Sequence, residues 1–206
     1  MSTMTSTDVT VLGAGAAGCA VAYYLSKLGV RVTVIHRDQI GFGASGKALG
    51  FLNPLSGYGI PGPLERLAMQ SYRLHEEMWE ALQEEATTDI QLQKIPDLHL
   101  CLSEDKVDLV NSEIDRWNSQ EGFSASWLTG EQVRTLEPRI VDSVLGARFD
   151  QNATLVNTSN FTQALYEAAC RFGTQFEVGN LQQILIDGDK ATGILLDDRT
   201  IHCDKW

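Results

Sequence analysis

The chain of 206 residues has the length of one ordinary domain, or of one domain and part of a second. Apolar residues make up 43% of it, which is enough for a sizeable core and argues against global disorder. Its 16 basic and 27 acidic residues give a net charge of −11, which repels phosphate backbones and anionic lipids, so nucleic acids and membranes are not the expected partners.

Targeting and metal-binding signals are weak in this sequence. The N-terminal segment MSTMTSTD lacks the basic and apolar regions of a secretory signal, and no apolar run approaches the roughly 20 residues needed to span a bilayer. The cysteines Cys19, Cys101, Cys170 and Cys203 are far apart and form no CxxC pair, which disfavours a zinc site. We therefore expect buried free thiols and a reducing, cytoplasmic location.

The first 36 residues predict a βαβ unit. An apolar strand over residues 8–12 is followed at once by a glycine-rich turn and by a helix that ends near Leu28. Gly29 stands where a residue in the left-handed conformation often follows a helix. Alternating valines predict a second strand over residues 30–36, and the helix between the two strands requires that they pair in parallel.

The glycine-rich turn has the GxGxxG spacing of a dinucleotide site. Gly13 permits the tight turn out of the strand, Gly15 allows the backbone to approach a pyrophosphate, and Gly18 allows the helix to pack closely on the strands. The N-terminus of the helix then presents its unpaired N–H groups to the phosphates. The strand–turn–helix–strand context supports the motif, so we expect Gly13, Gly15, Ala16, Ala17 and Gly18 to bind a dinucleotide.

The end of the second strand leaves the identity of the nucleotide open. An acidic residue commonly binds the adenosine ribose at this point, but here the chain reads His36-Arg37-Asp38. His36 could make a weaker bond to the ribose, Asp38 could replace the acid, or Arg37 could indicate a 2′-phosphate and hence NADP. In the alternative without a ligand role, these are solvent-facing residues at a strand end.

The middle of the chain predicts a long loop followed by an α+β region. Residues 39–63 are rich in Gly, Ser and Pro and are expected to form a functional loop without regular structure. A long amphipathic helix follows over 64–85, and strands are expected within 90–102. A further helix is predicted over 104–119 with Ser103 as its N-cap. The apolar face predicted for the long helix carries Leu64, Leu67, Ala68, Ser71, Leu74, His75, Met78 and Leu82.

The remaining sequence predicts a short capped helix and a return to helix and strands. Thr129 and Gln132 have the spacing of a capping box, and Pro138 marks the end of that helix. A strand is expected near 143–150, and a helix over 158–172 that Gly173 ends. After it, strands alternate with the turns DGDK and DDRT up to the final IHCDKW.

The loop sequence GASGKALGFLNP resembles the flavin-contacting segment of the FAD-dependent D-amino-acid oxidase and glycine oxidase superfamily. In that family a Ser-Gly pair and a later Gly-x-Leu-x-Pro bring backbone N–H groups to the pyrophosphate and the isoalloxazine ring. Close approach of the backbone to a flat ring is chemically reasonable where glycine is present. The contacts that the resemblance implies are Ser45, Gly46, Lys47, Ala48, Gly50, Phe51 and Leu52.

The resemblance covers nearly the whole chain and implies its domain organisation. It implies an α/β fold with a Rossmann-like FAD-binding domain, in two segments over residues 1–88 and 151–206, and part of an inserted α+β substrate domain over 89–150. By position, Leu181 is expected to contact the adenine through its backbone, and His36 and Arg37 to lie at the ribose. The cofactor implied is FAD.

The function implied is oxidation of the carbon–nitrogen bond of a small amino acid or secondary amine, by hydride transfer to the flavin. The family's substrate-binding arginine and tyrosine are expected beyond Trp206, so no catalytic residue is assigned and the chain alone is expected to be an inactive, incomplete piece. Two alternatives remain open. One is the oxidoreductase module of a tRNA wobble-uridine modifying enzyme, which the loop also resembles, and the other is an NAD(P)-binding or non-catalytic Rossmann module.

Overall fold

The computed structural model describes residues 7–202 except 58 and 198, and these residues divide into two compact units. Unit 1 comprises 1–49, 76–91 and 157–206, and unit 2 comprises 50–75 and 92–156. The N-terminal MSTMTS segment, Cys203 and the rest of the predicted final strand lie outside the described residues. The sequence assigned 50–75 to the first FAD-binding segment, whereas the structure groups it with unit 2. The assignment of cofactor and substrate to separate domains remains a prediction.

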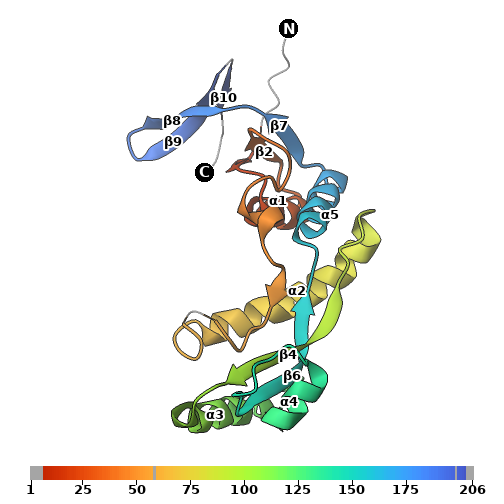
Figure 1. Cartoon of the computed structure of the whole chain (residues 1–206). Helices are drawn as coiled ribbons and strands as arrows, with labels where there is room; N and C mark the ends of the chain where they lie inside the picture. The colour runs from red at the N-terminus through yellow and green to blue at the C-terminus, as the bar shows by residue number, and fades with distance from the viewer. Residues whose placement is uncertain (1–6, 58, 198, 203–206) are drawn as a thin grey trace. The chain divides into compact units, whose positions relative to one another are not determined.

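Unit 1 is built on a parallel sheet in which β1 (Val9–Leu12), β2 (Val32–His36) and β7 (Gln175–Val178) lie in the order β1-β2-β7. Helix α1 (Ala16–Lys27) joins the first two strands, and α5 (Thr158–Arg171) leads into the third (Figure 1). The predicted βαβ unit, its parallel pairing and the helix before the tail are therefore confirmed. The carboxyl ends of all three strands meet at one edge of the sheet, beside the start of α1.

Helices α1 and α5 pack against each other because both bury small side chains (Figure 1). Cys19 and Ala22 of α1 and Ala164 and Ala168 of α5 are fully buried, and small residues let two helix axes come close. The predicted glycines end both helices in the left-handed region, with φ of 82° at Gly29 and 95° at Gly173.

The C-terminal part of unit 1 is an antiparallel sheet of β8 (Leu181–Asp187), β9 (Lys190–Leu196) and β10 (Thr200–His202). These strands confirm the predicted alternation of strands and turns. A small apolar cluster attaches this sheet to β2, and its buried members are Ile35, Ile194 and Leu196.

The segment 39–63 is more ordered than the sequence suggested. It contains a 3₁₀ turn, η1 (Ala44–Lys47), and a short strand, β3 (Phe51–Leu52). The expectation of a loop without regular structure was therefore wrong. The segment is ordered because η1 is hydrogen-bonded to other parts of unit 1 and β3 joins the sheet of unit 2.

Helix α2 (Glu65–Glu85) confirms the predicted long helix, but its buried face is shifted. Leu67 and Leu74 are exposed, so that part of the predicted face was wrong. Met78 and Leu82 are buried as expected. The aromatic residues Tyr72 and Trp79, which the pattern had left out, complete the buried face.

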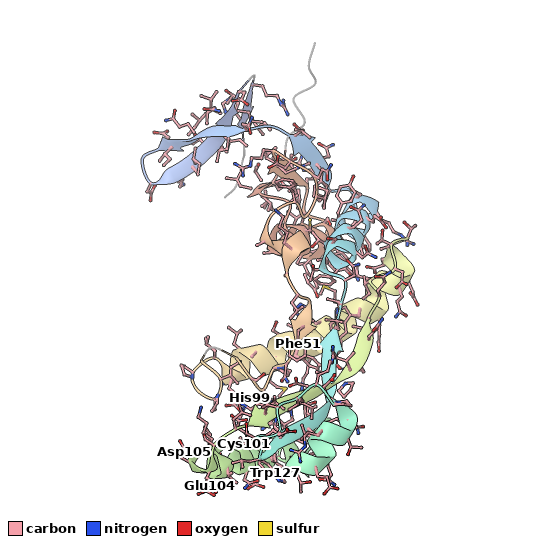
Figure 2. The ribbon with its side chains drawn as sticks, in the orientation of Figure 1. Phe51, His99, Cys101, Glu104, Asp105 and Trp127 are labelled. Carbon is pink, nitrogen blue, oxygen red and sulfur yellow. The ribbon has the colours of Figure 1, made fainter. Side chains whose placement is uncertain are left out.

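Unit 2 is built on an antiparallel sheet in which β6 (Gly146–Leu155) lies between its neighbours. The two strands expected within 90–102 form a single strand, β4 (Gln93–Cys101), with a bulge at Pro96, which has no N–H to donate to the ladder. A further strand, β5 (Ala125–Thr129), was not predicted, and β3 pairs with the far end of β6. Figure 2 labels side chains on three of these strands, namely Phe51 on β3, His99 and Cys101 on β4, and Trp127 on β5.

The predicted helix over 104–119 appears as a 3₁₀ turn, η2 (Glu104–Lys106), that continues into α3 (Val107–Asn118). Val110 and Trp117 of α3 are buried. Ser103 is the N-cap residue of this turn as predicted, although its side chain makes no capping bond. Entry through a 3₁₀ turn replaces the ordinary N-terminal geometry that a serine cap serves.

Helix α4 (Gly130–Leu136) begins with the predicted capping box. Gln132 N–H donates to Thr129 Oγ1 at 3.4 Å, and Thr129 N–H donates to Gln132 Oε1 at 2.8 Å. The helix covers an apolar cluster that includes Val133 and Val144. The capping box thus fixes α4 on the sheet of unit 2.

Two further expectations concern thiols and membranes. Cys19 and Cys101 are buried and free, whereas Cys170 is exposed, so burial was wrongly predicted for Cys170. It lies in the last turn of α5. Throughout the described part of the chain, no helix combines the length and the apolar character that crossing a membrane requires.

Candidate dinucleotide-binding site

The glycine turn lies at the carboxyl edge of the parallel sheet in unit 1. Gly13 follows β1 with φ of 104°, a conformation that favours glycine, and its N–H donates to Ile35 O of β2 at 2.8 Å. Helix α1 begins three residues later at Ala16, with Gly15 as its N-cap. The amides of Ala16, Ala17 and Gly18 lie in the first turn, where a helix offers no intrahelical acceptor.

Two of the glycines are required by close contacts. A Cβ on Gly18 would collide with Gly13 O and lie 3.4 Å from Val11 Cγ1, so no side chain fits between α1 and β1. A Cβ on Gly15 would lie 3.0 Å from Ser45 Oγ. The close packing predicted for Gly18 therefore has a direct steric basis, whereas the approach of a pyrophosphate at Gly15 stays a prediction.

Ser45 connects the loop after β2 to the start of α1. Its hydroxyl oxygen accepts a bond from Ala16 N–H at 3.0 Å. The hydroxyl proton remains available to donate, so this side chain can relay the positive end of α1 to an anionic ligand. The loop is held in place by two backbone bonds, Gly41 N–H to Ala14 O and Gly46 N–H to Gly41 O, both at 2.8 Å.

The turn η1 is also tied to the N-terminus of α5. Thr158 Oγ1 donates to Ala48 O and Ser159 Oγ donates to Gly46 O, each at 3.1 Å. The Ser-Gly pair is thus fixed from two directions, by α1 and by α5.

A pocket of about 240 Å³ opens between the glycine turn and this loop. It adjoins a second pocket of about 760 Å³, because both are lined by His36, Arg37, Asp38, Gln39 and Phe42. The remaining residues around the first pocket are Gly13, Ala14, Gly15, Gly43, Ala44 and Ser45. The structure therefore joins the predicted phosphate-binding turn and the predicted ribose position in one continuous hollow.

His36 at the end of β2 and the two residues that follow it bond mainly to one another. His36 Nδ1 lies 2.6 Å from the backbone oxygen of Asp38. Arg37 Nε donates to Asp38 Oδ2 at 2.9 Å, in an ion pair whose side chains are 76% and 41% exposed. The Arg37 guanidinium and the Asp38 carboxylate thus already have a partner in each other.

Two predicted residues lie at the edge of this arrangement or away from it. Lys47 Nζ lies 5.3 Å from the centroid of the Phe42 ring, beside the pocket. Leu181, at the start of β8, lines neither pocket, so its predicted contact with adenine stays a prediction. The larger pocket is lined instead by Val178, which is the register partner of His36. Parallel pairing of the strand that follows α5 is the signal by which the sequence could have found Val178.

Unit 2 contains three of the predicted flavin contacts, Gly50, Phe51 and Leu52. Gly50 has φ of 81°, and its carbonyl accepts a bond from Val156 N–H at 3.0 Å. Phe51 and Leu52 form β3, and the Phe51 side chain is 37% exposed (Figure 2). Their predicted contacts with the flavin stay predictions.

The fold and the glycine turn define a dinucleotide-binding protein of the Rossmann-like class. Residues 8–204 match the sequence profile of the family described as FAD dependent oxidoreductase, and the chain belongs to this family. Its cofactor is FAD, so the family match favours the flavin over the nicotinamide alternative.

Individual relatives agree with the family. The chain is 30% identical over 167 residues to a glycine oxidase of Geobacillus kaustophilus, covering 81% of this chain and 44% of the relative. It is 28% identical over 198 residues to the 4-methylaminobutanoate oxidase (formaldehyde-forming) of Paenarthrobacter nicotinovorans, covering 95% and 23%. The crystal structure of glycine oxidase from Geobacillus kaustophilus superposes with a TM-score of 0.83 at 28% identity, covering 97% of this chain and 54% of that one. The chain thus spans less than half of the length of the two curated relatives and about half of the solved glycine oxidase.

Proposed function

We propose that unit 1 binds FAD and that the whole protein oxidises the carbon–nitrogen bond of a small amino acid or secondary amine. The observation that carries the first part is the continuous hollow from Gly13–Gly15 to His36, bounded by Ser45. The second part is supported by the relatives, which include a glycine oxidase and a 4-methylaminobutanoate oxidase. Both names denote enzymes that act on small amino acids.

The residues of this chain suit the pyrophosphate of FAD. The first-turn amides of α1 can donate to phosphate oxygens, and the hydroxyl of Ser45 can add a further bond. Gly15 leaves room for the phosphates, because a Cβ there would already meet Ser45. No basic side chain is needed at this point, since the helix N-terminus supplies the positive potential.

The chemistry that FAD supplies when bound is acceptance of a hydride from the carbon next to the amine nitrogen. In this proposal the chain's own task is positioning. η1 is fixed by its bonds to α1 and α5, so the Ser-Gly pair presents its backbone in one conformation. Lys47 and Ala48, and in unit 2 Gly50–Leu52, are proposed to contact the flavin ring because the family resemblance implies it.

Titration with FAD tests the first part. The chain of 206 residues should bind FAD, seen as quenched flavin fluorescence and as a flavin absorption spectrum that stays with the protein in gel filtration. A protein that remains colourless with FAD and responds only to NADPH would contradict the proposal. The substrate class is tested in the whole protein by anaerobic reduction of the bound flavin. Glycine or sarcosine should bleach it, whereas bleaching by hydroxy acids or polyols alone would exclude the amine class.

A further inference from the structure

We propose that His36 is held in a single tautomer and binds the adenosine ribose of FAD as a lone hydrogen-bond acceptor. The inference rests on the proposed function, since it assumes that unit 1 binds FAD. It specifies how the adenosine end of the site works when the acid usual at this position is absent.

The tautomer follows from one short contact. His36 Nδ1 lies 2.6 Å from Asp38 O, and a backbone carbonyl oxygen can only accept a hydrogen bond. Nδ1 must therefore carry the proton and donate it. In the neutral imidazole the other nitrogen, Nε2, is then unprotonated and offers one lone pair.

The position of the ring is fixed by its surroundings. His36 ends β2, and its carbonyl accepts a bond from Gly179 N–H at 2.9 Å. Its ring packs edge-on against Phe176 of β7, with centroids 6.3 Å apart. His36 is among the residues that line both pockets, one of which begins at the glycine turn.

The neighbouring charged groups are less suited to the ribose. The Asp38 carboxylate accepts a bond from Arg37 Nε at 2.9 Å, so the acid closest in sequence is engaged next to the pocket. The same ion pair offsets the Arg37 charge, which would otherwise favour a 2′-phosphate. The strand end therefore fits an unphosphorylated ribose and offers it one acceptor, where a carboxylate would offer two oxygens.

Three variants test this role by FAD affinity, measured from flavin fluorescence with the whole chain. His36→Glu should tighten FAD binding about tenfold, since it restores a charged, two-oxygen acceptor. His36→Phe keeps an aromatic ring against Phe176 but lacks both nitrogens, and should weaken FAD binding about tenfold. Asp38→Asn should bind FAD as the wild type does. FMN, which lacks the adenosine, serves as the control ligand, because any affinity for it should be the same in all three variants.

The tautomer is tested separately by nitrogen-15 NMR of the histidine rings, with the His36 signal assigned by its loss in His36→Phe. A protonated Nδ1 and an unprotonated Nε2 are expected, and the opposite pattern would overturn the inference. It is equally overturned if His36→Phe binds FAD as tightly as the wild type, or if Asp38→Asn is the variant that loses affinity. In those cases the wild type still binds FAD and the proposed function stands. If the wild-type chain binds no FAD, both the inference about His36 and the proposed function are contradicted.

Discussion

The two units of this chain treat polar groups in opposite ways. In unit 1, the glycine turn Gly13–Gly15 and the Ser45 side chain line a pocket, and the Ser45 hydroxyl, which accepts a bond from Ala16 N–H, can still donate to a ligand. In unit 2, Arg148 is only 2% exposed, and its guanidinium lies 3.9 Å from the centroid of the Trp117 ring. It is bonded to Glu113 and paired with Asp97 at 3.7 Å.

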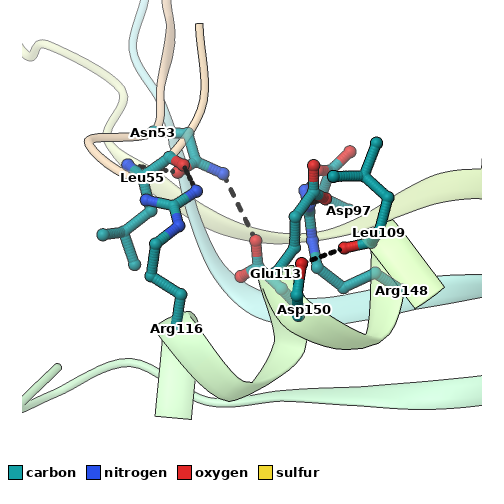
Figure 3. A network of polar contacts seen from close by, with 9 residues as sticks. Asn53, Leu55, Asp97, Leu109, Glu113, Arg116, Arg148 and Asp150 are labelled. Atoms are coloured by element: carbon teal, nitrogen blue, oxygen red, sulfur yellow. Dashed lines mark hydrogen bonds and ion pairs between the residues drawn. The ribbon is translucent and has the colours of Figure 1, made fainter. Parts of the chain in front are cut away.

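The network around Arg148 extends across unit 2 (Figure 3). Asn53 Nδ2 donates to Asp150 Oδ2 at 3.3 Å, so the segment after β3 is tied to β6. Arg116 Nη2 of α3 donates to Leu55 O at 2.6 Å. Both cationic side chains of this network are thus used within the unit. Charged groups thus bond to one another within unit 2, whereas the pocket of unit 1 adjoins the backbone turn at Gly13–Gly15 and the Ser45 hydroxyl.

The largest effect should come from Gly18→Ala. Alanine is the better helix former by about 1 kcal/mol, so propensity alone predicts a gain in stability. The collision of the new Cβ with Gly13 O should reverse this, with a loss of about 3 kcal/mol and of measurable FAD binding. Chemical denaturation and FAD titration measure the two effects. Gly43→Ala is the matched control for stability, because a Cβ on Gly43 meets nothing within 4 Å. Equal stability of both variants would contradict the steric role of Gly18.

A second large effect is expected in unit 2, from Arg148→Met. Methionine keeps much of the volume but leaves Glu113 without its buried partner, so we expect a loss of about 3 kcal/mol in the free energy of unfolding. The double variant Arg148→Met/Glu113→Gln should recover part of it, because no unpaired carboxylate remains. If the single variant is as stable as the wild type, the network does not hold unit 2 together. The FAD affinity of the folded protein should fall much less than in Gly18→Ala.

The parts of the site that the sequence could predict are those governed by local rules. The roles of Gly13, Gly15 and Gly18 follow from backbone geometry, which a short motif encodes. The Thr129–Gln132 capping box is equally local and was confirmed. The fold class followed from the order of strands and helices together with the family resemblance, and the family match confirms it.

Features that depend on partners elsewhere in the fold could not be predicted from the sequence. Strand β5 exists because β6 offers it a pairing edge, and its own residues carry little alternation. Val178 lines the pocket only because β7 pairs with β2 in a register that brings it beside His36. The Arg37–Asp38 ion pair is a side-chain arrangement, which the sequence alone could not predict.

A smaller effect, with a distinct pH dependence, is expected from Glu167 in unit 1. Partial burial acts to raise the pKa of Glu167, but bonds from Thr88 and Thr87 outweigh burial and lower the pKa from 4.5 to about 2. Because the folded pKa lies below the unfolded one, this contribution is present above about pH 4.5 and is lost as the pH falls toward 2. Glu167→Gln should cost about 1–2 kcal/mol at pH 7.

Urea unfolding at pH 7 and pH 3 checks this prediction. The stability difference between wild type and Glu167→Gln should shrink at the lower pH, and a difference that stays constant would assign the effect to packing alone. Glu177→Gln offers a comparison, since that carboxylate is paired at the surface with Arg199 and should matter less.

The smallest effect should come from Tyr23→Phe, which tests whether polar groups in unit 1 away from the pocket behave like those of unit 2. Tyr23 is 1% exposed, and its hydroxyl donates to Glu85 Oε2 at 2.6 Å and accepts from Lys27 Nζ at 2.9 Å. Removing the hydroxyl leaves the Lys27–Glu85 ion pair in place, so the loss should be only about 1 kcal/mol. Tyr24→Phe is the matched control, because Tyr24 is 45% exposed and its variant should keep wild-type stability.

Thermal unfolding without and with saturating FAD separates the two kinds of polar group. The loss in Tyr23→Phe should be the same in both conditions, because its hydroxyl serves the packing of α1 and not the ligand. A loss seen only with FAD would place Tyr23 among the groups that serve the cofactor.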